Sequence, residues 1–172
     1  MKILEEIRKS DKKPKELNLY IAKLILEKKP STKDFTDAIS MGSDAERGTC
    51  IEALEFATQT HPEIAKSYLS QVINCLSDKA PRVKWEASRV IANVAKVLPK
   101  EAEKAVENLL KNTTDKGTVV RWSTAFALGE IAKNNIKLRP LLISKINGIL
   151  KKEQNNGVKN VYLKALNIIE KK

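Results

Sequence analysis

The chain has 172 residues, and 42% of them are hydrophobic, which is enough to build a continuous core. Only 6 Gly and 6 Pro occur among recurrent Ala, Leu, Ile, Lys and Glu, which argues against a fold rich in β-hairpins and favours an all-α fold. The 32 Lys and Arg against 21 Asp and Glu give a formal charge of +11, which attracts anionic partners but equally suits lysines that only keep a helical array soluble.

The two cysteines and the distribution of apolar residues bear on location. Cys50 and Cys75 lie within apolar helical patterns and form no Cys/His cluster, so we expect buried thiols and no metal site. No segment approaches 18 consecutive apolar residues, and the first 30 residues lack the apolar core of a signal peptide. We therefore expect a cytoplasmic protein without a membrane partner.

The first part of the chain, residues 1–40, has an irregular helical pattern. An apolar stripe runs from Leu17 to Ile25, Pro30 interrupts it, and a short helix follows around Phe35. Terminal repeats of a repeat protein are usually atypical. We therefore interpret residues 1–40 as a degenerate N-terminal repeat or cap.

The rest of the chain repeats itself about every 37 residues. Similar segments begin at Val83, Val120 and Val158, and one further step back places Arg47 under Lys84. This period predicts four second helices that start near residues 44, 81, 118 and 156, with partner helices over 62–76, 99–110 and 138–150. We expect one domain over residues 1–172, with regular repeats over 41–172.

The copy that begins at Val120 carries a recognisable family pattern. Its residues are Val120, Arg121, Ala125, Ala127, Leu128, Gly129, Ile131 and Ala132. This stretch resembles the second helix of HEAT repeats, and the resemblance covers about residues 31–172. It implies an α-solenoid of about four HEAT-like hairpins, whose second helices line a concave face that serves as the presumptive binding surface.

An acid stands six residues ahead of a base in three repeats. The pairs are Asp78 with Lys84, Asp115 with Arg121, and Glu153 with Lys159, whereas Met41 stands in the place of the acid ahead of Arg47. A row of bases at one level is compatible with contacts to a phosphate backbone. The acids favour the other interpretation, a structural ladder that braces the turns, as is typical of the HEAT family.

Two tryptophans, Trp85 and Trp122, hold the same place in consecutive repeats, so we expect stacking to bring them together. One helical turn further come Arg89 and Phe126, and another turn further come Asn93 and Glu130. Aromatic and arginine side chains dominate interface hot spots, which makes these six residues the candidate binding site. The alternative is that both indoles only cover the seam between stacked helices.

Two functions remain open. The first is a non-catalytic scaffold that binds a protein or peptide on the concave face. The second is a basic nucleic-acid-binding module, and the alkylpurine DNA glycosylases with a HEAT-like fold also carry Trp on a basic concave face.

Catalysis is not expected. In those glycosylases a catalytic Asp accompanies the aromatics, whereas Arg89 and Phe126 follow the tryptophans here. No recognised catalytic or phosphate-loop motif occurs, and the single histidine, His61, precedes Pro62 in an expected turn. We therefore expect neither enzyme activity nor a cofactor.

Overall fold

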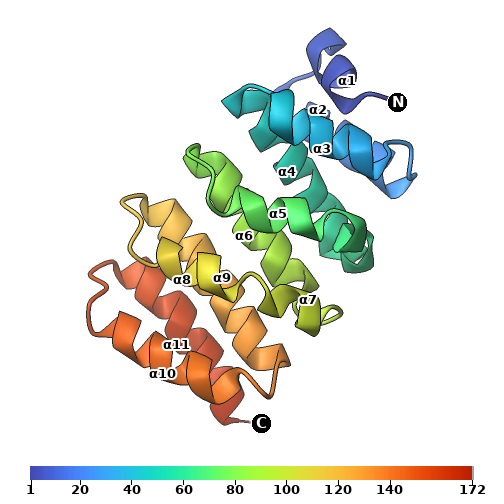
Figure 1. The fold of residues 1–172 in the computed structure, drawn as a ribbon. Helices are drawn as coiled ribbons and strands as arrows, with labels where there is room; N and C mark the ends of the chain where they lie inside the picture. The colour runs from blue at the N-terminus through green and yellow to red at the C-terminus, as the bar shows by residue number, and fades with distance from the viewer. Residues whose placement is uncertain (172) are drawn as a thin grey trace.

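The computed structural model describes residues 1–171, which form eleven α-helices and one 3-10 helix and contain no β-strand (Figure 1). In chain order the elements are α1 (Ile3–Lys9), α2 (Pro14–Leu26), α3 (Thr32–Met41), α4 (Asp44–Thr60), η1 (Pro62–Ser67), α5 (Leu69–Cys75), α6 (Pro81–Val94), α7 (Pro99–Glu103), α8 (Val106–Asn112), α9 (Thr118–Asn134), α10 (Arg139–Leu150) and α11 (Asn156–Glu170). The fold is an α-solenoid, as the repeat predicted.

The four second helices begin where the period predicts, at Asp44, Pro81, Thr118 and Asn156. Local chemistry fixes several of these starts. Ser43 forms a capping box with Glu46 ahead of α4, and the side chain of Asn155 accepts the Val158 N–H at the start of α11. Pro81 occupies the first turn of α6, where its missing N–H group is not needed.

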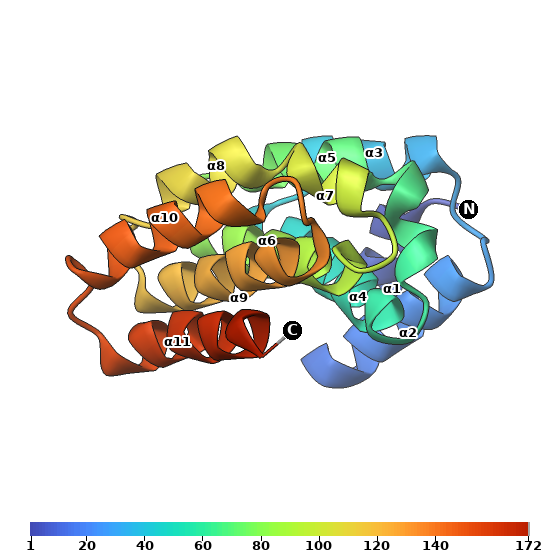
Figure 2. The same cartoon turned by 90° about the horizontal axis from the view of Figure 1, so that it is seen from below.

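The helices form two layers. The second-helix layer consists of α2, α4, α6, α9 and α11, each packed against the next. The first-helix layer consists of α3, η1 with α5, α7 with α8, and α10. Figure 2 shows α6 and α9 set closer to the first-helix layer than α2 and α11, so the second-helix layer is bowed and its concave face points away from the first-helix layer.

Close packing between second helices depends on small residues. One core cluster of buried side chains extends from Ile3 in α1 to Ile169 in α11. A Cβ added at Gly129 of α9 would lie 2.8 Å from the Cβ of Ala165 in α11. These helices therefore approach so closely that glycine at position 129 is the residue that fits without a shift.

The first helices differ from the prediction in two repeats. The predicted helix over 62–76 is divided into the 3-10 turn η1 and α5, and the one over 99–110 into α7 and α8. Both breaks fall where an apolar stripe continues, because periodicity in sequence does not separate an unbroken α-helix from two short helical pieces. Of the three partner helices predicted over 62–76, 99–110 and 138–150, only the last is unbroken, as α10.

The N-terminal region is irregular, and α2 is its principal packing element. Ile21 and Ile25 of α2 are fully buried, and α2 packs against α4 as the other second helices pack against their neighbours. The short helix α3 buries Phe35, whose ring centroid lies 4.6 Å from that of Tyr68 in the next repeat.

An ion-pair ladder joins successive repeats along one edge. The pairs are Arg47 Nη2 to Asp78 Oδ1 at 2.8 Å, Lys84 Nζ to Asp115 Oδ2 at 2.7 Å, and Arg121 Nε to Glu153 Oε2 at 2.8 Å. Each acid also accepts the backbone N–H group two residues further along at 2.8 Å. Every acid of the ladder therefore both shapes its own turn and binds the preceding repeat.

The register of this ladder corrects the sequence prediction. The acid does not pair with the base six residues later in its own repeat; it pairs with the base 31 or 32 residues earlier. The base stands in the first turn of its second helix, where the side chain leans toward the N-terminal end and reaches the adjacent turn of the next repeat. Lys159 therefore has no ion-pair partner within residues 1–171, because Glu153 binds Arg121.

Candidate functional site

An exposed tryptophan and a partly buried phenylalanine lie side by side on α9. Trp122 of α9 is 41% exposed, and its ring centroid lies 5.9 Å from that of Phe126 one helical turn further, with the ring planes tilted by 35°. Large apolar side chains in a well-packed core are covered, so an indole left open to this extent is available to a partner.

A groove of about 290 Å³ lies beside this pair, between α9 and α11. Trp122, Phe126 and Gly129 line it from α9, and Ala165 and Ile168 line it from α11. Gly129 and Ala165 are the small residues at a close approach of α9 to α11, and larger side chains of both helices line the groove around them. Most of its lining residues are apolar, and the charged ones are Glu130, Lys133 and Lys164.

The second predicted tryptophan behaves differently. Trp85 is half-buried, and its Nε1–H donates to Glu86 Oε1 at 2.7 Å. The prediction that stacking brings the two indoles into contact is wrong. Among residues 1–171 the aromatic contacts are Trp122 with Phe126 and Phe35 with Tyr68. Trp122 therefore has the exposed position, whereas Trp85 belongs to a polar cluster.

This polar cluster joins α4 to α6 around Glu55, which is only 2% exposed. Arg89 Nη2 lies 3.2 Å from Glu55 Oε1, and Asn93 Nδ2 donates to Thr58 Oγ1 at 3.0 Å and to Glu55 Oε1 at 3.3 Å. Arg89 and Asn93 are thus engaged within the protein, which reduces their availability to a ligand.

Glu86 is the buried acid of the same cluster and is 4% exposed. Its Oε2 accepts no hydrogen bond, and the nearest cation is Arg89, with Nη1 at 3.5 Å. Burial raises the pKa of the Glu86 carboxyl to about 7, although the hydrogen bond from Trp85 and the charge of Arg89 oppose that rise. No sequence pattern singles out Glu55 or Glu86, because helical spacing alone does not separate a buried acid from a solvated one.

The last predicted site residue, Glu130, forms an ion pair with Lys133 on the same helix. It lines the groove together with Trp122 and Phe126. The structure therefore brings three of the six predicted residues to one groove and assigns Trp85, Arg89 and Asn93 to the neighbouring cluster. Sequence reasoning missed the contribution of α11, for which a glycine within a helix, Gly129, was the available signal of close approach.

Other reactive groups lie away from these two clusters. Cys50 and Cys75 are buried free thiols, as predicted, and burial raises the pKa of each to about 12. His61 stands in the turn between α4 and η1, also as predicted. Within the described chain, no group of three or more His, Cys, Asp and Glu side chains is arranged to hold a metal ion, and no helix is long and apolar enough to cross a membrane.

The two-layer stack of repeated hairpins defines a helical repeat solenoid. No protein-family model and no curated protein matches the chain. Among solved structures it is similar to an engineered protein with a TM-score of 0.74 at 18% identity, over 95% of this chain and 79% of that one.

It is also similar to designed armadillo repeat proteins. One, YIII(Dq)4CqI, has a TM-score of 0.71 at 17% identity, covering 89% of this chain and 72% of that one. Another, described in complex with the peptide (KR)4, has a TM-score of 0.67 at 19% identity, covering 98% and 89%. The chain spans only 37% and 62% of the length of two further engineered proteins that it matches. Identities this low establish the shared fold alone.

Proposed function

We propose that this protein is a non-catalytic scaffold that binds a peptide segment of a partner protein on its concave face. The observation that carries the proposal is the exposed Trp122 in contact with the partly buried Phe126, beside the groove between α9 and α11. An apolar side chain of the partner would enter the groove, and the indole would cover it.

The surroundings of the groove support a peptide as the partner. An anchor of this kind consists of a tryptophan next to a concave, largely apolar pocket with a few polar groups at the rim. Lys133, Lys164 and Glu130 provide those polar groups. Structural neighbours of this chain include designed armadillo repeat proteins for modular peptide recognition, a use of the same fold that supports the proposal.

Peptide display tests the proposal whatever the identity of the natural partner. A random peptide library is selected on the wild-type protein, and enriched peptides are measured against Trp122→Ala, Phe126→Ala and the matched control Ile136→Ala. Ile136 is an apolar residue that is 76% exposed in the turn between α9 and α10. We expect Trp122→Ala to weaken binding by about tenfold or more and the control to leave it unchanged.

Two results would contradict this function. One is the selection of no peptide above background, and the other is a set of peptides that bind wild type and both aromatic variants equally. Circular dichroism of each variant separates a lost contact from a lost fold.

We also propose that the repeats are of the HEAT class and form one domain with an N-terminal cap. The second-helix pattern around Val120 and Gly129 supports HEAT, although two first helices are divided, as in repeats built from three helices.

Two free, buried cysteines suit a reducing compartment, and we place the protein in the cytoplasm.

A further inference from the structure

A second groove, of about 650 Å³, lies away from the concave face. It runs along the edge where each first helix turns into its second helix, between the α8–α9 turn, α10 and the α10–α11 turn. We call it the turn-edge groove, and its principal lining residues are Lys116, Lys145, Gly148, Ile149 and Lys152. Its volume is within the range of ligand-binding clefts.

The three lysines of this groove are unneutralised. None of Lys116, Lys145 and Lys152 forms an ion pair within the described chain, and all three are exposed. The groove contains two acids, Asp115 and Glu153, but both are already engaged in the ladder that joins the repeats.

The engagement of these acids has an electrostatic consequence. Burial alone would raise the pKa of Asp115, but hydrogen bonds from Lys84 and the Gly117 N–H lower it below its ordinary value. Burial alone would likewise raise the pKa of Glu153, but Arg121 and the backbone N–H groups of Asn155 and Gln154 lower it below its ordinary value. Both acids are therefore ionised at neutral pH, and their ion-pair partners are Lys84 and Arg121 of the ladder. Of the three lysines, only Lys116 also acts on one of these acids, through a longer-range attraction to Asp115.

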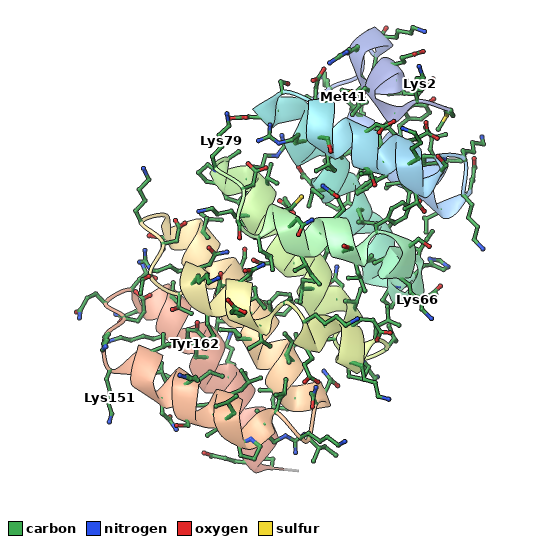
Figure 3. All side chains as sticks on the ribbon, viewed as in Figure 1. Lys2, Met41, Lys66, Lys79, Lys151 and Tyr162 are labelled. Atoms are coloured by element: carbon green, nitrogen blue, oxygen red, sulfur yellow. The ribbon has the colours of Figure 1, made fainter. Side chains whose placement is uncertain are left out.

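The basic character continues along the same edge. Lys79 and Lys116 directly follow the ladder acids of consecutive repeats, 37 residues apart. Figure 3 shows Lys79 and Lys151 projecting from this edge of the solenoid, whereas Lys66 projects from the opposite edge. An extended partner that runs along the last three of these turns would meet Lys79, then Lys116, then Lys151 and Lys152.

We infer that the turn-edge groove binds an acidic, extended segment of a partner protein, with Lys116, Lys145 and Lys152 as its carboxylate contacts. Charge complementarity is the basis of this choice, since the whole chain carries a formal charge of +11. The groove contains no aromatic side chain on which a nucleic-acid base would stack, while Gly148 leaves open space and Ile149 offers an apolar wall. This site is independent of the concave face.

The test compares two triple variants with the same loss of charge. The first is Lys116→Gln/Lys145→Gln/Lys152→Gln, and the control is Lys66→Gln/Lys100→Gln/Lys137→Gln at the opposite edge. The probe is a fluorescent peptide of alternating Glu and Ala, followed by anisotropy at low salt, with a Gln and Ala peptide and a labelled single-stranded DNA alongside.

We expect the groove variant to weaken binding of the acidic peptide by about tenfold, and the control to weaken it by less than about threefold. Equal weakening by both variants would overturn the proposal, because it would reveal diffuse attraction by the net charge. So would the absence of any binding of the acidic peptide. Tighter binding of the DNA that depends on the same three lysines would reassign the groove to nucleic acid.

Discussion

Replacing Glu86 by glutamine should make the protein more stable at alkaline pH and change little at acidic pH. Glu86 is buried with one carboxylate oxygen that accepts no hydrogen bond, and burial raises its pKa to about 7 from an ordinary 4.5. The folded protein therefore holds this proton more tightly than the unfolded chain does. Folding stability is lost as the pH rises from about 4.5, and the loss is complete above about 7.

The size of the effect follows from the difference between the two pKa values. At about 1.36 kcal/mol per pH unit, wild type is destabilised by about 1 kcal/mol at pH 5 and about 3 kcal/mol at pH 8. Glutamine has no proton to lose and keeps an oxygen that accepts the Trp85 N–H. We therefore expect Glu86→Gln to exceed wild type by about 2 kcal/mol more at pH 8 than at pH 5.

Urea unfolding followed by circular dichroism at the two pH values measures this difference. The matched control is Glu63→Gln, since Glu63 is exposed at the start of η1. If the difference in unfolding free energy between Glu86→Gln and wild type does not grow from pH 5 to pH 8, the raised pKa of Glu86 is refuted. If the difference between Glu63→Gln and wild type grows equally, burial is not the cause of the effect.

The remaining predictions concern packing, the ladder and the thiols. Gly129→Leu should destabilise the fold by about 1–3 kcal/mol through overpacking. Gly148→Ala places its methyl group in open space and should stabilise the fold by about 0.5–1 kcal/mol. Urea unfolding measures the free energy of unfolding of both variants. Double-mutant cycles should give a coupling energy of about 1–3 kcal/mol between Arg121 and Glu153 and of less than about 0.5 kcal/mol between Lys159 and Glu153. A larger coupling energy for Lys159 with Glu153 would show that the acid pairs within its own repeat. Both cysteine thiols, with pKa values raised to about 12, should resist a thiol reagent at pH 8 until denaturant is added, and rapid native-state labelling would contradict their burial.

The outcome for the candidate site differs from residue to residue. Trp122, Phe126 and Glu130 meet at one groove, but Trp85, at the equivalent position of the preceding repeat, donates its indole N–H to Glu86. The difference arises because the partner of Trp85 is an acid on the next residue, while Trp122 is followed by Ser123 and lies against Phe126. Equivalent places in a repeat give equivalent backbone positions, and the neighbouring side chains then decide exposure.

The sequence by itself determined the helical class, the period and the starts of α4, α6, α9 and α11. The starts follow from the period of about 37 residues. A capping residue or a proline also marks the starts of α4, α6 and α11, whereas α9 has neither. Tertiary structure alone decided which base meets which acid, where the first helices divide and which tryptophan stays exposed. The pairing of bases with acids and the close approach of α9 to α11 depend on contacts between residues about one repeat apart, such as Arg121 with Glu153 and Gly129 with Ala165. The exposure of each tryptophan depends on the three-dimensional positions of its neighbouring side chains, Glu86 for Trp85 and Phe126 for Trp122.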